Sequence, residues 1–537
     1  MIRWLLAVAL LAAPQGKQIP PAGIPVPPAD KAELEAGVKQ LGAELDGLRK
    51  AKPDLYADVE IFHKAVHDAL KYDEFLNAKD IAVAKDLIKV GLERAKDPKA
   101  AWTTATGLIP RGYVSKIDGS VQPYGMVVPA SYKPGTKTRL DFWLHGRDEN
   151  LTELHFVQSR LKSAGEFTPA DAIVCHLYGR FCNASKFAGE VDLFETLDSV
   201  KKRYTIDENR ISVRGFSMGG ASTWHLGAHH AGLWACVAPG AGFAETPVYS
   251  NIYKDPVKPT PWQETLWHMY NATDYAENYF NTNLVAYSGE IDPQKAAADT
   301  MAKALKEAGI DMIHIIGPKT AHKYEPEAKK EVIKRVDEFA AKGRDPNPKK
   351  IRFTTWTLRY NEMKWLTVDG LEKHWERAHV EADQDGGKVT LTTKNVSALS
   401  LATPSKVLID GQELAAAPHY RKVDGKWAAG AVEGPAKRHG LQGPIDDAFM
   451  DSFVMVTPTG KPLNEKVGSW AASEQERAIT MWRRFFRGEA RVVKDDAVTE
   501  AMIAESNLVL WGDPSSNKVL GKIADKLPIQ WTAGEIA

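Results

Sequence analysis

A serine stands at the centre of the pentapeptide Gly215-Phe216-Ser217-Met218-Gly219, directly after a strand-like run at 210–214 and directly before a helical pattern. A G-x-S-x-G sequence between a strand and a helix makes a turn so tight that its outer positions must be glycine. Such a turn lifts the serine hydroxyl above the sheet and points N–H groups of the helix N-terminus toward it. The pattern therefore predicts that Ser217 is a nucleophile.

A serine hydroxyl needs a base to take its proton and an acid to orient that base, in the chain order Ser, Asp, His. Asp292 lies in a loop after a strand-like run, so we assign it as the acid, with Glu290 as its rival. His322 follows the next such run and is assigned as the base, because His314 lies inside the run itself. Three histidines on the helix after the Ser217 turn are expected mainly to pack within the fold: His225, His229 and His230.

The oxyanion that forms when serine attacks a carbonyl group needs two N–H donors that are held in place beforehand. The backbone N–H of Met218, one residue past the nucleophile, is the first candidate. We expect the second in the loop after an early strand, where the run 140–144 leads directly into His145-Gly146-Arg147. Because glycine lets the backbone approach a substrate closely, we assign Arg147 N–H, or that of its neighbour Gly146, as the second donor.

Aromatic residues are concentrated in one stretch of the chain. Residues 244–280 hold eight aromatic residues in 37, against 9% for the whole chain, together with four prolines. This stretch follows the next strand-like run after the Ser217 turn, and we expect it to lie over the active site. The stretch therefore predicts a lid whose rings, Trp262 and Trp267 among them, can stack on a sugar or an aromatic ring. Packing of the lid on its own domain is the alternative for part of these rings.

Three further residues are candidates for substrate binding. Tyr178 and Arg180 follow the strand-like run at 172–177 and are expected at the same edge of the sheet. Arg180 could hold a substrate carboxylate through two parallel hydrogen bonds, and a structural ion pair is the alternative. Trp224, on the helix after the Ser217 turn, could line the active site or pack on the helix face.

These residues require a framework that brings the ends of several strands together. From about residue 112 to residue 342, short strand-like runs alternate with helical patterns. This alternation predicts an α/β fold with a doubly wound, mostly parallel sheet. In such a sheet the carboxyl ends of the strands share an edge, and ligands bind there.

The other stretches of the chain differ in pattern and predict separate units. Apolar steps of three and four before residue 98 indicate a helical hairpin or bundle, and alternating runs after residue 350 indicate a β-module. In chain order we expect a signal peptide (1–16), a proline-rich linker (17–30), a helical segment (31–111), the α/β catalytic domain (112–342, with the lid at 244–280), a small antiparallel β-rich module (351–424) and a C-terminal α/β module (425–537).

The N-terminal sequence predicts the compartment. Arg3 precedes an apolar run from Trp4 to Ala13 and then small residues suited to cleavage, which is the pattern of a secretory signal peptide. The run is shorter than the ~20 apolar residues that span a bilayer. We therefore expect a secreted or periplasmic protein without a membrane span. Whether Cys175 and Cys182 form a disulfide stays open, and a buried thiol at Cys175 is favoured.

The composition excludes several classes of protein. Lys and Arg number 69 and Asp and Glu also number 69, so the formal net charge is zero, which argues against a nucleic-acid-binding protein. No Cys or His cluster has metal-ligand spacing, and no glycine-rich phosphate-binding motif occurs, so we expect no metal and no cofactor.

Five motifs in order carry a resemblance to a known family: HGR after a strand, YGR after a strand, RGFSMGG, SGEIDP and TAHKYEP. Through them, residues 112–342 resemble the catalytic domain of the prolyl oligopeptidase family and related secreted esterases of the α/β-hydrolase superfamily. The resemblance implies a serine hydrolase with Ser217, Asp292 and His322 as its triad. The chain departs from that family in one respect. The helical segment before residue 112 is too short to form the large β-propeller that filters peptides there.

We therefore expect a serine hydrolase that forms an acyl-enzyme and cleaves carboxylic esters of carbohydrates or aromatic acids. Amide cleavage demands tighter positioning, because the leaving nitrogen must be protonated, and no propeller supplies it. A serine-type peptidase acting on short peptides is the alternative, which the family resemblance favours. The substrate is thus a small ester, an oligosaccharide-linked ester or a short peptide. A non-catalytic extracellular binding or scaffold protein is the alternative from another class.

Overall fold

The computed structural model describes residues 18–532 and 534–535, so the signal peptide predicted at 1–16 lies outside the described residues. The described chain divides into two compact units. The first comprises the residues up to Pro98 together with Asp148–Gln158, and the second comprises Lys99–Arg147 and the residues from Ser159 onward. Within the part of the chain that is described, no helix is both long enough and apolar enough to cross a membrane.

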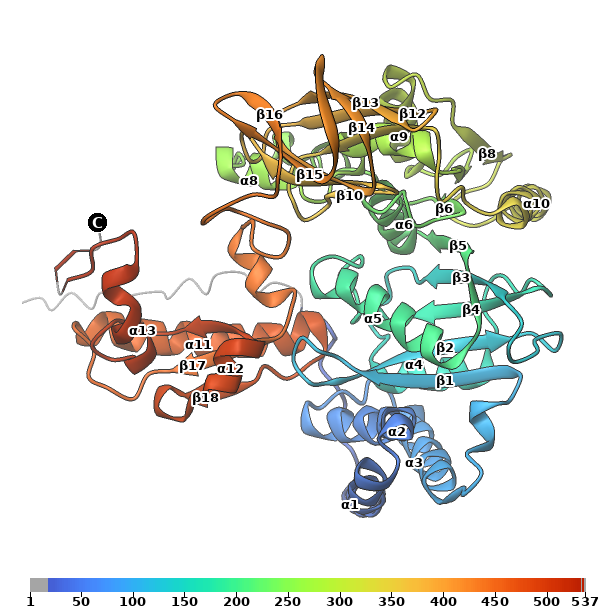
Figure 1. Cartoon of the computed structure of the whole chain (residues 1–537). Helices are drawn as coiled ribbons and strands as arrows, with labels where there is room; N and C mark the ends of the chain where they lie inside the picture. Colours follow the sequence, from blue (N-terminus) through green and yellow to red (C-terminus); the bar gives the residue numbers. More distant parts are fainter. Residues whose placement is uncertain (1–17, 533, 536–537) are drawn as a thin grey trace, which may run out of the picture. The chain divides into compact units, whose positions relative to one another are not determined.

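The first unit is built on three helices that pack side by side (Figure 1): α1 (Pro28–Ala51), α2 (Pro53–Lys71) and α3 (Lys79–Lys96). Apolar side chains recur on one face of each helix, and Leu41 of α1 and Phe62 of α2 are fully buried. Proline occupies the first position of α1 and of α2, where its missing N–H costs no hydrogen bond. The helices end at Lys96, earlier than the predicted helical range of 31–111.

The second unit contains an eight-stranded sheet with the strand order β1-β2-β4-β3-β5-β6-β7-β8 (Figure 1). Its strands are β1 (Gly107–Val114), β2 (Val121–Val128), β3 (Thr138–Leu144), β4 (Ala172–Leu177), β5 (Ile206–Phe216), β6 (Cys236–Gly240), β7 (Val285–Gly289) and β8 (Ile313–Gly317). The pairs β1–β2 and β2–β4 are antiparallel, and the other neighbours run parallel. The prediction of a doubly wound, mostly parallel α/β sheet is therefore confirmed.

Helices separate the parallel strands along the chain, namely α4 (Glu153–Lys162), α5 (Ala188–Arg203), α6 (Met218–His229) and α9 (Lys295–Glu307), and α10 (Pro326–Lys342) follows the last strand. Every residue of β4 and of β6 is buried, as expected for strands that are covered on both faces. The register places Leu144 of β3 opposite Gly215 of β5, and Gly289 of β7 opposite Gly317 of β8. The carboxyl ends of these strands therefore meet at one edge of the sheet.

A second sheet follows α10. It consists of β9 (Lys350–Thr355), β10 (Glu362–Met363), β11 (Leu366–Leu371), β12 (Ala378–Asp385), β13 (Lys388–Lys394), β14 (Val396–Ile409), β15 (Gln412–Val423) and β16 (Lys426–Ala429). The sheet differs from the small antiparallel β-rich module predicted over 351–424 at one pair, because β13 and β14 run parallel. The long strand β14 pairs antiparallel with β11 through its first half and parallel with β13 through its last residues.

The C-terminal part forms a third sheet of three parallel strands in the order β18-β17-β19. They are β17 (Phe453–Thr457), β18 (Val492–Lys494) and β19 (Asn507–Leu510), and the helices here are α11 (Glu465–Phe486), α12 (Glu500–Glu505) and α13 (Lys518–Ile523). Asn464 caps α11 by accepting from the N–H groups of Lys466 and Val467. Trp482 of α11 and Met455 of β17 belong to an apolar cluster with Ala188 of α5, which joins this part to the first sheet.

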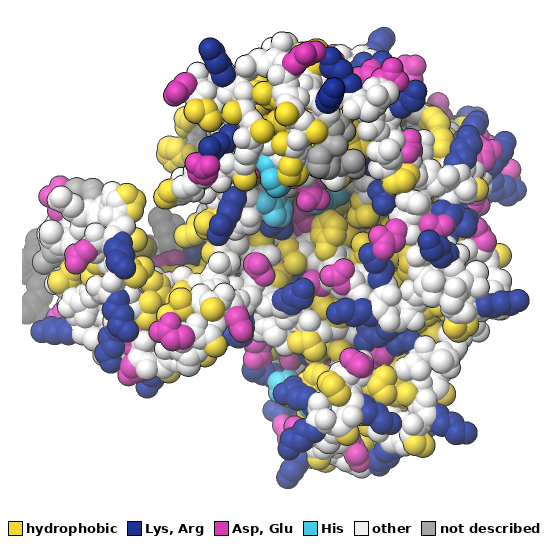
Figure 2. All heavy atoms as spheres, viewed as in Figure 1, with side chains coloured by type: hydrophobic (Ala, Val, Ile, Leu, Met, Phe, Trp, Pro, Cys, Tyr) yellow, Lys and Arg dark blue, Asp and Glu magenta, His cyan; other side chains and the backbone are white. Residues whose placement is uncertain are grey.

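Both signs of charge are spread over the surface. Figure 2 shows Lys and Arg side chains interspersed with Asp and Glu side chains on the face that it presents. This mixture of both signs agrees with the formal net charge of zero. That the protein does not bind nucleic acid stays a prediction.

Candidate active site

Ser217 lies in the turn between β5 and α6, and its backbone is in a sparsely populated conformation, with φ 59° and ψ −119°. The glycines on both sides make this turn possible. An alanine methyl group at Gly219 would lie 2.0 Å from the carbonyl oxygen of Leu144, and one at Gly215 would lie 2.3 Å from that of Gly219. A non-glycine residue held at positive φ is strained and persists only where its surroundings fix it. The local sequence therefore folds as the G-x-S-x-G pattern predicts.

The two candidate oxyanion donors lie next to the serine. Met218 is the first residue of α6, so its N–H is one of the helix N–H groups that have no partner within the helix. On the neighbouring strand, β3 leads into the loop that contains Gly146 and Arg147. The Cβ position of Gly146 lies 3.6 Å from Cβ of Ser217, so this backbone approaches the serine closely.

Asp292 and His322 form a direct hydrogen bond. Oδ2 of Asp292 lies 2.7 Å from Nδ1 of His322. Asp292 as a residue is 4% exposed, and its Oδ1 accepts a hydrogen bond of 2.9 Å from the N–H of Gln294. The bond to Asp292 directs the Nδ1 proton of His322 to the carboxylate and leaves Nε2 to accept a proton. The imidazole ring is 4.9 Å between centroids from the ring of Phe216, directly before the serine.

The rival residues are engaged elsewhere. The side chain of Glu290 accepts a hydrogen bond of 2.6 Å from the N–H of Lys319. His314 lies within β8, and its Nε2 is 3.0 Å from the hydroxyl of Ser288. Among the described residues, no hydrogen bond joins the Ser217 hydroxyl to His322. Such bonds are often long when no substrate is bound.

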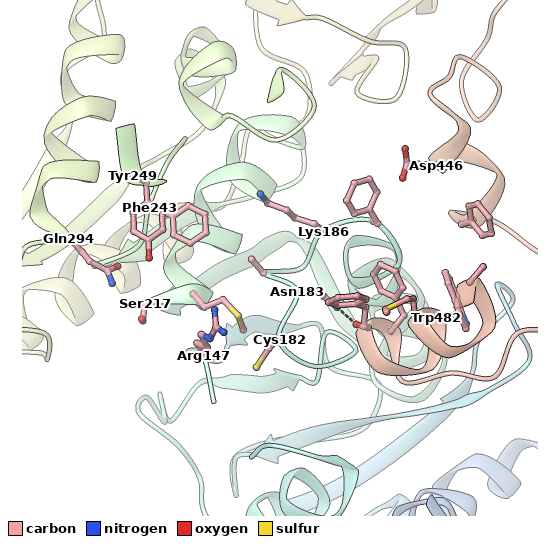
Figure 3. Close-up of a pocket in the computed structure, with 18 of the residues that line it drawn as sticks. Arg147, Cys182, Asn183, Lys186, Ser217, Phe243, Tyr249, Gln294, Asp446 and Trp482 are labelled. Atoms are coloured by element: carbon pink, nitrogen blue, oxygen red, sulfur yellow. Dashed lines mark hydrogen bonds between the residues drawn. The ribbon is translucent and has the colours of Figure 1, made fainter. Parts of the chain in front are cut away.

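A cavity of about 760 Å³ opens beside Ser217 and Met218. Figure 3 shows Ser217, Gln294 and Arg147 toward one end and Trp482 and Asp446 toward the other. Residues from the loops after β3, β4, β6 and β7, from the serine turn, from the lid and from the C-terminal part line it: Arg147, Cys182, Asn183, Ala184, Lys186, Phe187, Ser217, Met218, Phe243, Tyr249, Gln294, Asp446, Phe449, Met455, Ala478, Met481, Trp482, Phe485 and Phe486. We call it the serine-side cavity.

A second cavity, of about 670 Å³, lies beside His322. It is lined by Trp143, Gly146, Glu166, Phe216, His322, Lys323, Tyr324, Pro326, Lys329, Lys330 and Ile333. We call it the histidine-side cavity. The candidate catalytic residues thus border two separate spaces.

Arg180 does not bind substrate as predicted, because its guanidinium group is fully buried. It pairs with Asp118 at 3.0 Å and donates to the carbonyl oxygen of Phe486 at 3.2 Å. The structure thus supports the alternative reading, a structural ion pair. Tyr178 and Trp224 are corrected as well, since their side chains are 0% and 1% exposed. Trp224 packs against Tyr279 within the fold, with its ring edge-on at 6.2 Å.

The lid residues divide between packing and exposure. The lid holds the helices α7 (Pro247–Ser250) and α8 (Pro261–Trp267), and three aromatic residues near its end are buried, Tyr270, Tyr275 and Tyr279. Trp262 is 67% exposed, and Trp267 packs edge-on against Tyr253. Neither tryptophan lines the two cavities described above, and their roles in substrate binding stay predictions. Tyr249 and Phe243, stacked at 4.3 Å, line the serine-side cavity instead.

Sequence reasoning missed the wall that α11 gives to the serine-side cavity. The steps Met481, Trp482, Phe485 and Phe486 mark an apolar helix face, but periodicity alone does not say what that face meets. It also missed Lys186, which lies just beyond the YGR motif. Burial lowers the pKa of Lys186 to about 8. The sequence feature that could have pointed to Lys186 is its place in a loop directly after a strand of the parallel sheet.

Two remaining predictions concern sulfur and metal ligands. Cys175 is a buried thiol whose pKa is raised well above its usual value by burial. Among residues 18–532 and 534–535, no group of three or more His, Cys, Asp or Glu side chains is arranged to hold a metal ion. The absence of a cofactor stays a prediction.

Comparison with known proteins gives one family match. Residues 186–344, which include Ser217, Asp292 and His322, match the model of the prolyl oligopeptidase family. No curated protein is detectably similar in sequence to this chain.

Solved structures resemble part of the chain. A puromycin-hydrolyzing peptidase from Mycobacterium tuberculosis is 12% identical over 45% of this chain and 40% of its own, with a TM-score of 0.34. An acylaminoacyl peptidase from Pyrococcus horikoshii is 14% identical over 47% of this chain and 45% of its own, with a TM-score of 0.34. A thermostable esterase is 17% identical over 44% of this chain and 63% of its own, with a TM-score of 0.31. Each match spans less than two thirds of the other protein. Residues 186–344 are therefore similar to the prolyl oligopeptidase family, and this similarity supports a serine hydrolase.

Proposed function

We propose that this protein hydrolyses carboxylic esters through an acyl-enzyme on Ser217. His322 takes the proton of the Ser217 hydroxyl as its oxygen attacks the ester carbonyl, and Asp292 orients the imidazole and stabilises its charged form. The N–H groups of Met218 and Arg147 bind the oxyanion of the tetrahedral intermediate. His322 then gives its proton to the leaving alkoxide. Water attacks the acyl-enzyme by the same steps and releases the acid.

One observation carries this proposal. Asp292 and His322, which come from loops after two different strands, form a hydrogen bond of 2.7 Å at the sheet edge where the strained Ser217 turn lies. A buried carboxylate that holds a half-exposed imidazole beside such a turn is the arrangement that activates a serine hydroxyl. A scaffold protein that has lost catalysis has no physical need for a serine held at positive φ.

Esters are the favoured substrates because an alkoxide leaves readily, whereas an amide nitrogen must be protonated as it departs. Peptide cleavage therefore needs tighter positioning of substrate and acid. A serine-type peptidase acting on short peptides is the second candidate. The match of residues 186–344 to the prolyl oligopeptidase family is the observation that favours it.

The first experiment tests catalysis itself. The purified protein is treated with a fluorophosphonate probe and assayed on p-nitrophenyl acetate, beside Ser217→Ala and the matched control Ser163→Ala, an exposed serine. We expect labelling and turnover in the wild type and in Ser163→Ala. Ser217→Ala is expected to lose both, with kcat lower by about 10³-fold or more. A wild-type protein without label or turnover would support the non-catalytic scaffold instead.

The second experiment separates the substrate classes. Acetylated and feruloylated xylan, a glucuronate ester and proline-containing peptides are offered to the wild type in competition. We expect the wild type to release more product from the esters than from the peptides, and Ser217→Ala to release none. Peptide products without ester turnover would overturn the ester proposal in favour of the peptidase.

We also propose that the protein is exported. The support is the pattern of its first sixteen residues, a basic residue, an apolar run and small residues before a possible cleavage position. Fractionation of the producing cells, with N-terminal sequencing of the mature chain, tests this. Recovery of the uncleaved chain from the cytoplasm would contradict it.

A further inference from the structure

The two cavities beside the candidate catalytic residues suggest which part of a substrate lies where. The serine-side cavity borders Ser217 and Met218, the attacking residue and the first oxyanion donor. The histidine-side cavity borders His322, which protonates the leaving group. Since the acyl group stays on the serine while the leaving group departs past the acid, the serine-side cavity is the place for the acyl group.

The far wall of the serine-side cavity is apolar and bulky. It comes from the C-terminal part of the chain, and its members are Phe449, Met455, Met481, Trp482, Phe485 and Phe486. Trp482 and Met455 are buried in the cluster that joins this part to the first sheet, so the wall is fixed in place. Phe485 is 57% exposed, and its ring is available to a ligand. An acyl group of only two carbons would leave such a wall uncovered.

Lys186 brings a cation to the same cavity. Its Nζ lies 5.8 Å from the ring centre of Phe243 and 5.2 Å from that of Tyr270, and Figure 3 shows it on the cavity wall between Ser217 and Trp482. Among the described residues, no carboxylate forms an ion pair with it. The acid nearest in sequence, Glu190, is bound by His230 at 2.8 Å and by the hydroxyl of Tyr360 at 2.9 Å.

A partly buried ammonium group without an acidic partner carries a desolvation cost, and this burial lowers the pKa of Lys186 to about 8. At pH 7 the group is still mainly charged, and an anion brought by a ligand would relieve the cost of its burial. The charges around it favour such an anion. Arg147 lies toward the same end as Ser217, whereas Asp446, the acid that also lines this cavity, lies toward the opposite end (Figure 3).

We propose that the serine-side cavity selects acyl groups that carry both a bulky apolar part, which packs on the wall from α11, and a carboxylate, which pairs with Lys186. This inference rests on the proposed serine hydrolase function and names the substrate class for that site. The substrates are esters or amides of aryl-substituted acids that bear a second acid group. Carboxylate recognition, expected at Arg180 from the sequence, is thereby assigned to Lys186.

The test compares two p-nitrophenyl esters at pH 7, one of phenylbutanoic acid and one of the same acid with a para-carboxyl group. We expect the wild type to favour the carboxyl-bearing ester in kcat/KM by about tenfold or more. Lys186→Met should abolish that preference, whatever its turnover of the neutral ester, and Lys186→Arg should retain most of it. The matched control is Lys254→Met, an exposed lysine of the lid, which should behave as the wild type.

A second pair of variants tests the apolar wall. Phe485→Ala should lower the preference for phenylbutanoyl over acetyl esters several-fold, because it removes an exposed ring of the wall. Trp470→Ala, at a 65% exposed position of the same helix outside the cavity, should not.

The proposal is overturned if the wild type favours the neutral ester, or if Lys186→Met leaves the preference as it was. It also fails if Phe485→Ala and Trp470→Ala act alike. The failure of the proposed hydrolysis would look different, since no ester would be turned over and Ser217 would take no label. In that case calorimetric titration with the para-carboxyl acid still tests the role of Lys186. The acid should bind Ser217→Ala, and it should bind the Lys186→Met, Ser217→Ala double variant about tenfold more weakly.

Discussion

Trp482 donates its indole N–H to Oδ2 of Asp118 at 2.8 Å, and that oxygen also lies 3.0 Å from Nη1 of Arg180. All three side chains are buried. Burial would raise the pKa of Asp118, but the ion pair with Arg180 and the hydrogen bonds from Ser120 and Trp482 together outweigh it and hold the pKa below its usual value. The tryptophan that lines the serine-side cavity is thus fixed by a hydrogen bond to an ionised carboxylate in the loop between β1 and β2.

The first prediction concerns this bond. Trp482→Phe keeps an aromatic ring in the cluster but removes the donor, so we expect a loss of about 1–3 kcal/mol in the free energy of unfolding. Urea or thermal unfolding followed by circular dichroism measures it. Trp470→Phe on the exposed side of α11 is the matched control and should be near neutral. Equal stability of the two variants would mean that the bond to Asp118 contributes nothing.

The second prediction concerns the serine turn. Gly219→Ala places a methyl group 2.0 Å from the backbone oxygen of Leu144, which belongs to a central strand and cannot move aside cheaply. We expect a loss of more than about 2 kcal/mol in stability and of most of the activity. Gly47→Ala near the C-terminal end of α1, where a methyl group meets nothing within 4 Å, should instead raise stability by about 0.5–1 kcal/mol. An active, stable Gly219→Ala enzyme would contradict the close approach of the two backbones.

The third prediction separates the two candidate acids. Asp292→Asn keeps the shape of the side chain but removes the charge that favours the Nδ1–H form of His322. We expect kcat to fall by about 10³–10⁴-fold with little change in KM, as removal of an orienting carboxylate does in other serine hydrolases. Glu290→Gln should stay within a few-fold of the wild type, since that side chain binds the backbone of Lys319. A larger fall in kcat for Glu290→Gln than for Asp292→Asn would assign Glu290 as the acid of the triad instead.

The fourth prediction concerns pH and stability. His225 is buried, its Nε2 donates to the carbonyl oxygen of Ala184 at 2.9 Å, and burial lowers its pKa to about 4. In the unfolded chain the ring takes a proton near pH 6.5, so the unfolded state binds more protons between pH 6.5 and 4. The contribution of this group is therefore fully present above pH 6.5 and falls by about 1.4 kcal/mol per pH unit as the pH drops toward 4.

His225→Gln keeps the donor position and removes the titration. Urea unfolding at a series of pH values should show a shallower acid slope for the variant than for the wild type, with parallel curves above pH 7. Identical slopes between pH 6.5 and 4 would show that His225 is not the group responsible.

The serine turn and its partners could be predicted because each is a local feature. The glycines around Ser217 report a backbone conformation, and Asp292 and His322 each follow a strand whose end must lie at the same sheet edge. The order of these three motifs along the chain is enough to bring them together once the sheet is parallel. The same reasoning predicted the mostly parallel sheet from the alternation of short apolar runs and helical patterns.

Arg180 and the cavity wall could not be predicted, because each depends on a partner far away in the sequence. A loop arginine after a strand looks the same whether it faces a substrate or a buried acid such as Asp118. The apolar face of α11 likewise looks the same whether it covers its own sheet or another part of the molecule. The parallel pairing of β13 with β14 was missed for a related reason, since turn residues between two runs predict a hairpin and say nothing of a strand long enough to change partners.

The apolar wall of the serine-side cavity and the residues proposed to cut the substrate are encoded in separate stretches of the gene. Ser217, Asp292 and His322 all precede residue 343, whereas Met481 and Phe485 lie in a helix that begins at Glu465. Mutations in that helix can change what fits beside the serine without altering any atom that takes part in bond cleavage. Natural or engineered changes in this helix can therefore alter substrate specificity while the catalytic residues stay the same.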